Sequence, residues 1–137
     1  MKLLYIIFCD DIRQEINNKF SLIGLYNDRI VFINKKSEIT WPQPINLSVF
    51  LRFSVDKNKE LPDAFEFEYH LNKTPIVKIN GQLNIDIKNE SQFQLAINRV
   101  YIPLEPGYLG FSIKLYSHKK ILFSEVKEAA LVIAGNE

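Results

Sequence analysis

The sequence predicts an all-β protein: a single antiparallel β-sandwich, immunoglobulin-like, of roughly seven to nine strands over residues 1–137. The first observation is that apolar and polar residues alternate, which is the period of a strand with one buried face. The second is that such segments recur with turn residues between them, as in sandwiches and barrels. They do not alternate regularly with long amphipathic helices, so a parallel α/β sheet is disfavoured.

Two segments carry most of this prediction. In NLSVFLRFSV the apolar face is continuous, and the polar face is interrupted once, by Phe50. In FEFEYHL the separation is complete, with Glu66, Glu68 and His70 on the polar face. One buried and one solvated face are typical of antiparallel sheets. The residues assigned to the buried faces are Leu47, Val49, Leu51, Phe53, Val55, Phe65, Phe67, Tyr69 and Leu71.

Three shorter segments, LNIDI, FQLAI and FSIKL, repeat the alternation and are also predicted as strands. A turn at Asn80-Gly81 is predicted before LNIDI, and the facing of side chains decides its length. A three-residue loop with Gly81 in the left-handed conformation pairs Val77 with Leu83, apolar against apolar. We therefore expect a type I turn with a G1 bulge at this point.

The polar stretch FCDDIRQEINNKF lies between two apolar segments near the start of the chain. We interpret it as a β-hairpin with residues 17–19 in its loop, so that Ile16 lies opposite Phe20. The tip of this hairpin is expected to extend past the main sheet. A short helical turn over residues 10–17, capped by one of its aspartates, stays open as the alternative.

In the hairpin interpretation, the odd-numbered face carries Asp11, Arg13 and Glu15 at a spacing of two. Opposite charges at this spacing are neighbours on one face of a strand. These three residues, a charged stripe, are the candidate protein-interaction site. We identify no catalytic, cofactor-binding or metal-binding residues.

The remaining segments are connections and a closing hairpin. Residues 34–45 and 56–63 contain prolines and charged residues and are predicted to be surface loops. Turns are predicted at residues 106–107 and 117–120, each flanked by strands. Residues 124–134 combine helix-favouring and strand-favouring features, and we favour strands.

Composition excludes several classes of protein. The formal net charge of +1 provides no electrostatic footprint for nucleic acid. The single cysteine, Cys9, cannot form an intramolecular disulfide, which argues for a reducing, cytoplasmic location. The start MKLLYIIFCDD lacks small residues before the cysteine and continues with carboxylates, unlike a signal peptide. No segment approaches the roughly 18 apolar residues of a membrane-spanning helix, so no membrane association is expected.

Three groups of residues could carry chemistry, and each has a simpler explanation. Cys9 adjoins two carboxylates, which disfavour a thiolate, so we interpret it as a packed structural thiol. Glu66, Glu68 and His70 fit a solvated strand face better than an acid–base pair. The aspartates lack the spacing of a calcium loop and fit solvated turns. The aspartates considered for calcium are Asp10, Asp11, Asp28, Asp56, Asp63 and Asp86.

The segments FCDDIRQEINNKFSLIGLY and LEPGYLGFSIKLYSHKKILF resemble known proteins. The first is similar to the start of an uncharacterised family of small bacterial proteins of unknown function, although this chain has Asn17-Asn18 where a glycine is expected. The second is similar to the closing hairpin of many immunoglobulin-like sandwiches. The resemblance implies a cytosolic immunoglobulin-like fold and transfers no activity. The matching positions are Cys9, Asp10, Asp11, Arg13, Glu15, Lys19, Ser21, Leu22, Ile23, Gly24 and Tyr26.

The sequence favours a non-catalytic protein-binding or structural module that docks on a protein partner of unknown identity through a sheet edge or the N-terminal hairpin. Two alternatives stay open: a calcium-dependent ligand binder or enzyme with a site assembled from loops, and an accessory protein of a phage or mobile element. The richness in Asn, Ile and Lys suggests an AT-rich genome, with which the latter origin is compatible. Homo-oligomerisation also stays open.

Overall fold

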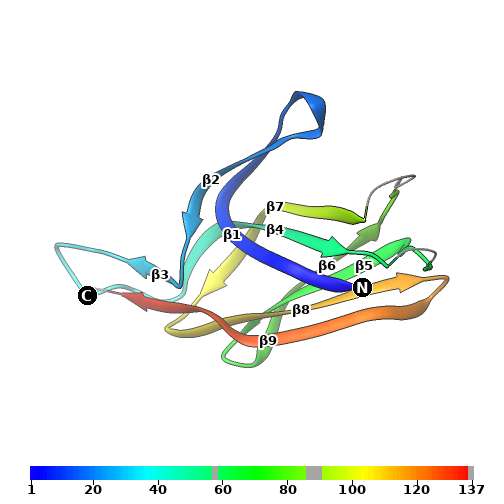
Figure 1. Ribbon diagram of the computed structural model, residues 1–137. Helices are drawn as coiled ribbons and strands as arrows, with labels where there is room; N and C mark the ends of the chain where they lie inside the picture. Colours follow the sequence, from blue (N-terminus) through cyan, green and yellow to red (C-terminus); the bar gives the residue numbers. More distant parts are fainter. Residues whose placement is uncertain (57–58, 86–90, 136–137) are drawn as a thin grey trace.

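The computed structural model describes residues 1–56, 59–85 and 91–135, and these residues form two β-sheets packed face to face (Figure 1). This arrangement confirms the predicted all-β sandwich. A four-stranded sheet has the order β2-β1-β4-β7, and a five-stranded sheet has the order β3-β9-β8-β5-β6. Neighbouring strands are antiparallel except β3 and β9, which are parallel.

The strands are long, and some extend past the end of a neighbouring strand, as β1 does beyond its pairing with β4. The four-stranded sheet consists of β1 (Lys2–Gln14), β2 (Phe20–Tyr26), β4 (Gln43–Ser54) and β7 (Gln92–Leu104). The five-stranded sheet consists of β3 (Arg29–Phe32), β5 (Ala64–Leu71), β6 (Thr74–Gln82), β8 (Gly107–Ser117) and β9 (Lys120–Gly135). A 3₁₀ turn, η1 (Ile16–Asn18), joins β1 to β2.

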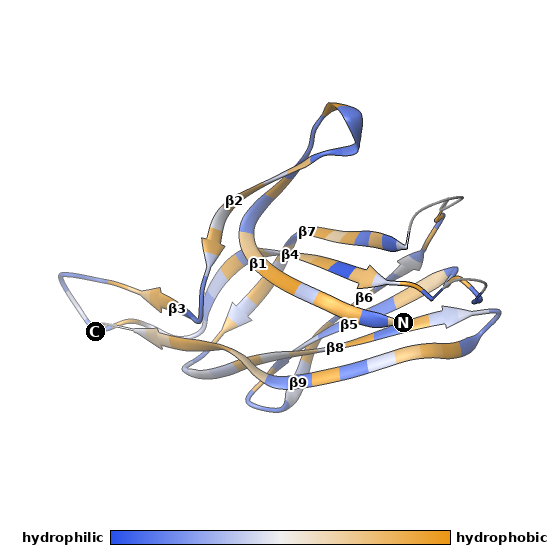
Figure 2. Ribbon diagram, in the orientation of Figure 1, coloured by the Kyte–Doolittle hydropathy of each residue, from blue (hydrophilic) through white to orange (hydrophobic). Residues whose placement is uncertain are grey.

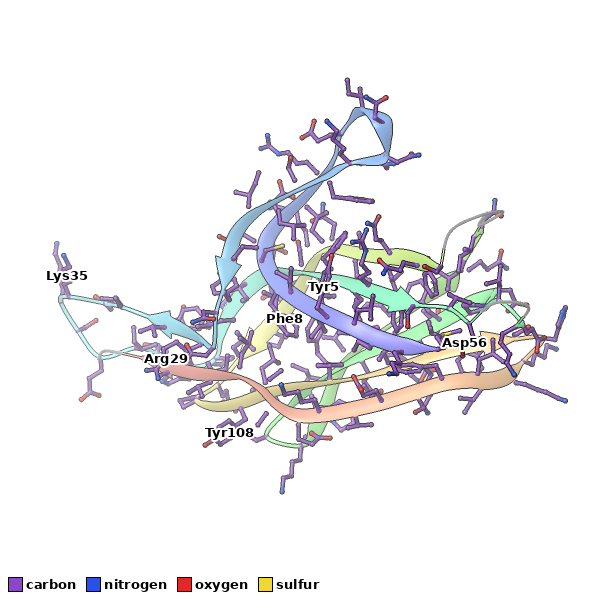
Figure 3. All side chains as sticks on the ribbon, viewed as in Figure 1. Tyr5, Phe8, Arg29, Lys35, Asp56 and Tyr108 are labelled. Carbon is purple, nitrogen blue, oxygen red and sulfur yellow. The ribbon has the colours of Figure 1, made fainter. Side chains whose placement is uncertain are left out.

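The predicted inward faces of β4 and β5 form the core between the sheets. All of the residues assigned to these faces are buried except Phe65, which is half-buried beside the edge strand β6. Aromatic rings fill the interior: Phe67 stacks on Phe111 with ring centroids 5.7 Å apart. Phe8 of β1 also lies between the sheets, with its ring centroid 6.2 Å from that of Phe111 (Figure 3). The core therefore comes from the two-residue period that the sequence displays.

The strand order can be compared with that of the immunoglobulin plan. If β1, β4, β5, β7, β8 and β9 correspond to strands A, B, C, E, F and G, then β1-β4-β7 reproduces the order A-B-E. On the opposite sheet, β5-β8-β9 reproduces the order C-F-G. The strand β2, on the outer side of β1, has no counterpart in this plan. The N-terminal hairpin is thus an addition to the sandwich.

Most predicted connections are confirmed. The chain turns between β7 and β8 at residues 105–106, and His118 and Lys119 form a tight turn with φ of 47° and 69° between β8 and β9. Residues 124–134 belong to β9, so the strand assignment is confirmed. A loop follows β3 and ends at the cis peptide bond Trp41-Pro42. The loop predicted over residues 34–45 is therefore shorter than expected, because residues 43–45 belong to β4.

The predicted turn at Asn80-Gly81 is wrong. Both residues lie within β6, and Gly81 pairs with Phe65 of β5. A Cβ atom on Gly81 would lie 2.9 Å from Cε1 of Phe65, so the glycine leaves room for a cross-strand aromatic ring. The β5–β6 turn is formed instead by Asn72 and Lys73, with φ of 50° and 69°.

The predicted strand LNIDI is not observed in the part that the structure describes. Leu83, Asn84 and Ile85 follow the end of β6 and are not in a strand. Asp86 and Ile87 lie outside the described residues.

Candidate functional site

The N-terminal hairpin projects from the sandwich as an arm, which we define as residues 10–26 (Figure 1). The pairing of β1 with β4 ends at Cys9 and Ser48, whereas its pairing with β2 continues to Gln14 and Phe20. The part of β1 beyond Cys9 therefore belongs to the arm. The predicted hairpin is confirmed, and the alternative of a helical turn over residues 10–17 is wrong.

The predicted loop is displaced by one residue. The loop is Ile16–Asn18, with φ of 62° and 57° at Asn17 and Asn18, and the backbone N–H of Glu15 donates to the carbonyl of Lys19 at 2.7 Å. Phe20 consequently pairs with Gln14 and not with Ile16. The same residues still share each face, because the register changes by two positions.

A small apolar cluster fixes the arm to the outer face of the four-stranded sheet. Its buried residues are Cys9, Ile12 and Phe50, and Ile7, Phe20 and Leu22 pack against them. Rings of Phe20 and Tyr5 lie 5.3 Å and 6.3 Å from that of Phe50. The observed register of the hairpin places the ring of Phe20 over that of Phe50. This contact explains why the observed register is preferred over the predicted one. We call this group the outer cluster.

Polar contacts hold the base of the arm where β1 separates from β4. Asn98 and Arg99 of β7 oppose the single residue Ser48 of β4, which makes a β-bulge with φ of 54° at Arg99. The side-chain oxygen of Asn98 accepts from the backbone N–H of Ile12 at 3.0 Å and lies 2.7 Å from the Ser48 hydroxyl. The side chain of Asn98 thus replaces the strand partner that β1 has lost.

A second polar contact links the two strands of the arm. The Tyr26 hydroxyl donates to the carboxylate of Asp10, beside Gly24, whose φ is +70°. A Cβ atom on Gly24 would collide with that carboxylate, and the positive φ itself favours glycine. Burial, followed by the hydrogen bond to Asp10, raises the pKa of Tyr26 to about 12.

The residues of the predicted charged stripe lie on the arm but differ in exposure. Arg13 is exposed and donates to the Asp11 carboxylate at 3.4 Å, whereas Glu15 is exposed at the start of the loop. Partial burial opposes ionisation of Asp11, but hydrogen bonds from Asn98 and Arg13 outweigh it and lower the pKa of this carboxyl. Asp11 therefore belongs to the base of the arm, and Arg13 and Glu15 are the accessible members of the stripe.

The outer edge of β2 pairs with no strand in the described part of the chain. The backbone hydrogen bond from Glu15 to Lys19 shows that these two residues form a hydrogen-bonded pair. Hydrogen-bonded and non-hydrogen-bonded pairs alternate along an antiparallel ladder, so the odd-numbered residues of β2 direct their N–H and C=O groups toward β1. Phe20 and Leu22 therefore direct their N–H and C=O groups outward, as does Tyr26, whereas Gly24, with φ of +70°, departs from the extended conformation. This edge is open to another strand.

Exposed aliphatic side chains accompany the open edge. Ile23 and Leu25 of β2 are 41% and 61% exposed, and Ile16 at the tip is 81% exposed. The rest of the tip is hydrophilic, whereas the part of β1 on the sandwich is largely hydrophobic (Figure 2). The arm thus presents apolar side chains beside unpaired backbone groups.

The expectation of a solvated His70 is wrong. The residue is 7% exposed, and its Nε2 and Nδ1 atoms lie 2.8 Å and 2.9 Å from carboxylate oxygens of Glu68 and Glu128. Glu128 belongs to β9, two strands away from β5. It reaches His70 across Gly110 of β8, where a Cβ atom would lie 2.5 Å from the carbonyl oxygen of Lys127.

Cys9 is fully buried in the outer cluster, as expected of a structural thiol. Burial raises its pKa above the ordinary value, with the nearby carboxylates of Asp10 and Asp11 acting in the same direction. The thiol lies 3.5 Å from the carbonyl oxygen of Asp11. This environment disfavours the thiolate that a nucleophile requires.

The aspartates considered for calcium have separate partners. Asp56 pairs with the N-terminal amine at 2.9 Å, Asp28 with Arg29 at 3.6 Å, and Asp63 accepts from the backbone N–H of His118 at 3.0 Å. Asp86 lies outside the described residues. Within residues 1–56, 59–85 and 91–135, no three His, Cys, Asp or Glu side chains are grouped as metal ligands.

Two functional features of the arm were missed in the sequence. Phe50 was recognised only as an apolar residue on a polar face, and that irregularity marks the outer cluster. The Ser48–Asn98 contact joins residues 50 positions apart, and no local sequence pattern predicts it.

The part of the chain that the structure describes contains no helix with the length and hydrophobicity needed to cross a bilayer. The comparisons with known proteins add no relative: no protein-family model and no curated protein matches the chain.

Proposed function

We propose that this chain is a protein-binding module that docks through the arm, by adding a strand of its partner to the outer edge of β2. The observation that carries the proposal is the open edge of β2, seven residues long, on a hairpin that lies outside the sandwich plan. Main-chain hydrogen bonds would supply affinity, and the side chains of alternate residues would supply specificity.

Other sheet edges in the described residues have features that oppose pairing. The edge strand β6 contains Pro75 and Lys78, and β7 contains Pro103 and the bulge at Arg99. The part of β1 that precedes the arm has a bulge at Leu4, and β3 is only four residues long. Prolines, lysines, bulges and short strands are common protections of edges. The strand β2 contains no proline and no charged residue.

The strand β9 is also unpaired on one side, because β3 covers only its residues 132–135. Glu125 and Lys127 pair with the core residues Ile113 and Phe111 of β8, and therefore lie on the inner face of the sheet. Charged residues that point inward on an edge strand oppose the addition of another strand. The distribution of these features favours β2 as the docking edge.

The accessible members of the charged stripe fit a role in orienting the partner. Arg13 lies near the end of β1, and Glu15 follows that strand at the start of the loop, so both flank the tip of the arm on the side opposite β2. Charges at the rim of an interface affect the rate of association more than the affinity. We therefore assign affinity to the backbone and aliphatic groups of β2 and orientation to Arg13 and Glu15.

The experiment is capture of partners from the native cell lysate by the full chain and by two matched variants. Ile23→Lys combined with Leu25→Lys places charges on the docking edge, whereas Val126→Lys places one at an equally exposed position of β9, 55% exposed. We expect the first variant to lose the partner and the second to retain it. Amide hydrogen exchange on the captured complex should show protection at residues 20–26.

Retention of the partner by the Ile23/Leu25 variant contradicts the proposal, provided that its circular dichroism spectrum matches that of the parent chain. Arg13→Glu tests the orienting role. It should slow association several-fold at low salt and leave the dissociation rate nearly unchanged. An unchanged association rate removes the stripe from the docking site.

A further inference from the structure

We infer that the strand added to β2 is the β2 strand of a second copy of this chain, paired antiparallel about a two-fold axis. The inference rests on the proposed function and names its partner. In a two-fold pairing, β2 lies antiparallel to an identical β2, so its residues must be compatible with the same sequence in the opposite direction. The sequence of β2 can be tested for this property.

A two-fold axis perpendicular to the sheet pairs residues of equal parity, since it keeps each face on the same side. With the axis at Ile23, Leu22 of one copy pairs with Gly24 of the other. Phe20 pairs with Tyr26 in the same way, so these pairs use the backbone groups that point outward from each β2. Phe20 and Tyr26 then supply regular hydrogen-bonding groups at both ends of the pairing, and Leu22 lies opposite Gly24, whose positive φ departs from the extended geometry.

Side chains are compatible in the same register. The partly exposed Ile23 lies opposite Ile23 of the second copy, with Leu25 diagonally adjacent to it, so aliphatic groups meet across the axis. No charged residue lies within β2, and hence no like charges are opposed along the strand. At each end, Lys19 of one copy lies opposite Asn27 of the other, next to the exposed carboxylate of Asp28.

The shape of the molecule permits this pairing. The arm extends away from the sandwich (Figure 1), and we expect this position to give a second copy access to β2. Because the pairing uses the same strand in both copies, it consumes both open edges and closes as a dimer. The inner-face charges of β9 oppose further growth of the assembly through the other sheet.

The test is sedimentation equilibrium of the purified full chain up to about 1 mM, a range suited to the small contact of two seven-residue strands. We expect a concentration-dependent dimer. Leu25→Lys should raise the dissociation constant by about tenfold or more, because each substitution occurs twice in a two-fold interface. Val126→Lys should leave it unchanged. A chain that stays monomeric throughout, or a dimer weakened only by Val126→Lys, overturns the inference.

A second variant tests the register. Ile23→Cys places two thiols at a non-hydrogen-bonded pair, where Cα atoms are about 4.5 Å apart and a disulfide can form. Oxidation should give a covalent dimer, and the matched variant Val126→Cys should not. The buried Cys9 serves as an internal control in both.

The outcomes separate this inference from the proposed function. A monomeric chain whose residues 20–26 are still protected by a captured protein overturns only the second copy as partner. A chain that neither dimerises nor loses its captured partner through the Ile23/Leu25 substitutions contradicts both.

Discussion

Two of the unpaired edges among the described residues, β2 and the free part of β9, show similar exposure but different protection. Leu25 of β2 and Val126 of β9 are 61% and 55% exposed, so exposed aliphatic side chains do not distinguish the edges. The difference lies beside them: Glu125 and Lys127 face inward on β9, whereas β2 has no charge. If β2 is the docking edge that we propose, the protection of the backbone distinguishes it from β9 better than hydrophobicity does.

The irregular part of the β9 edge coincides with the contact between Glu128 and His70. Leu109 pairs with Leu131 but Phe111 pairs with Lys127, so three residues of β9 oppose Gly110 alone. This bulge moves Glu128 over the glycine and into contact with His70. The bulge shapes the edge, and a polar contact on the outer face of the sheet holds the bulge in place.

The arm has a different kind of support. The outer cluster lies on the opposite face of the four-stranded sheet from the core, so the arm has a small apolar core of its own. Removing that support should affect β2 before it affects the sandwich. We therefore expect the largest loss of stability from a substitution in the outer cluster.

Phe50→Ala should lower the free energy of unfolding by about 3 kcal/mol, as for other buried phenylalanines. The ring contacts Phe20 and Tyr5 and is itself buried. We also expect residues 10–26 to lose amide protection while the core strands keep theirs. Urea denaturation and hydrogen exchange measure the two effects.

Leu25→Ala is the control on the same arm, because it shortens an exposed side chain and should cost about 0.5 kcal/mol or less. If Phe50→Ala leaves the arm as protected as in the parent chain, the outer cluster is not what holds it.

Gly110→Ala should lower the free energy of unfolding by about 2 kcal/mol through overpacking. Its Cβ would lie 2.5 Å from the carbonyl oxygen of Lys127 and 2.6 Å from Cα of Glu128, and backbone cannot retreat as a flexible side chain can. Loss of the His70 contact should also change the imidazole resonances in the NMR spectrum.

Ser112→Ala, on the outer face of the same strand, provides the comparison and should be nearly neutral. Equal stability of the two variants means that β9 can relax away from β8 at this point, and that the bulge is not fixed by the glycine.

Glu128→Gln should cost about 1 kcal/mol, because it weakens a charge-assisted hydrogen bond but leaves Glu68 in contact with His70. A double-mutant cycle with His70→Gln measures the coupling directly. Glu125→Gln, at an exposed position of the same strand, should show no coupling with His70. A coupling equal for both glutamates contradicts a specific role for Glu128.

The sandwich was predictable because its core depends on a local period. The inner face of β4 can be predicted from the alternation within that strand alone. Its buried residues are Leu47, Val49, Leu51 and Phe53. The hairpin, and the division of its residues between two faces, were predictable for the same reason. Its exact loop was not, because the register depends on Phe20 meeting Phe50, which is 30 positions away in the sequence.

The misplaced Asn80-Gly81 turn shows the limit of local turn signals. Asn-Gly favours a hairpin turn, but Gly81 here accommodates the ring of Phe65. The pairing of His70 with Glu128 also could not be predicted, because it requires the order β5-β8-β9 and a bulge opposite Gly110. Contacts with other strands, and not local residue preferences, decided both outcomes.

The smallest prediction concerns the pH dependence of the arm. Burial, together with the hydrogen bond to Asp10, raises the pKa of Tyr26 to about 12. A raised pKa means that the folded state favours the neutral phenol over the phenolate. The resulting stability is fully present below about pH 10, the pKa of an unperturbed tyrosine, and is lost as the pH rises through the folded-state pKa.

Tyr26→Phe removes this contribution, so its melting temperature should fall less steeply than that of the parent chain above about pH 10. Burial raises the pKa of Tyr69 in the core as well, and both chains share that effect, so the difference between them isolates Tyr26. Absorbance at about 295 nm should show one fewer late-titrating tyrosine in the variant. Parallel melting curves would mean that the Asp10–Tyr26 contact is absent in solution, and the arm would then depend on the outer cluster and Asn98 alone.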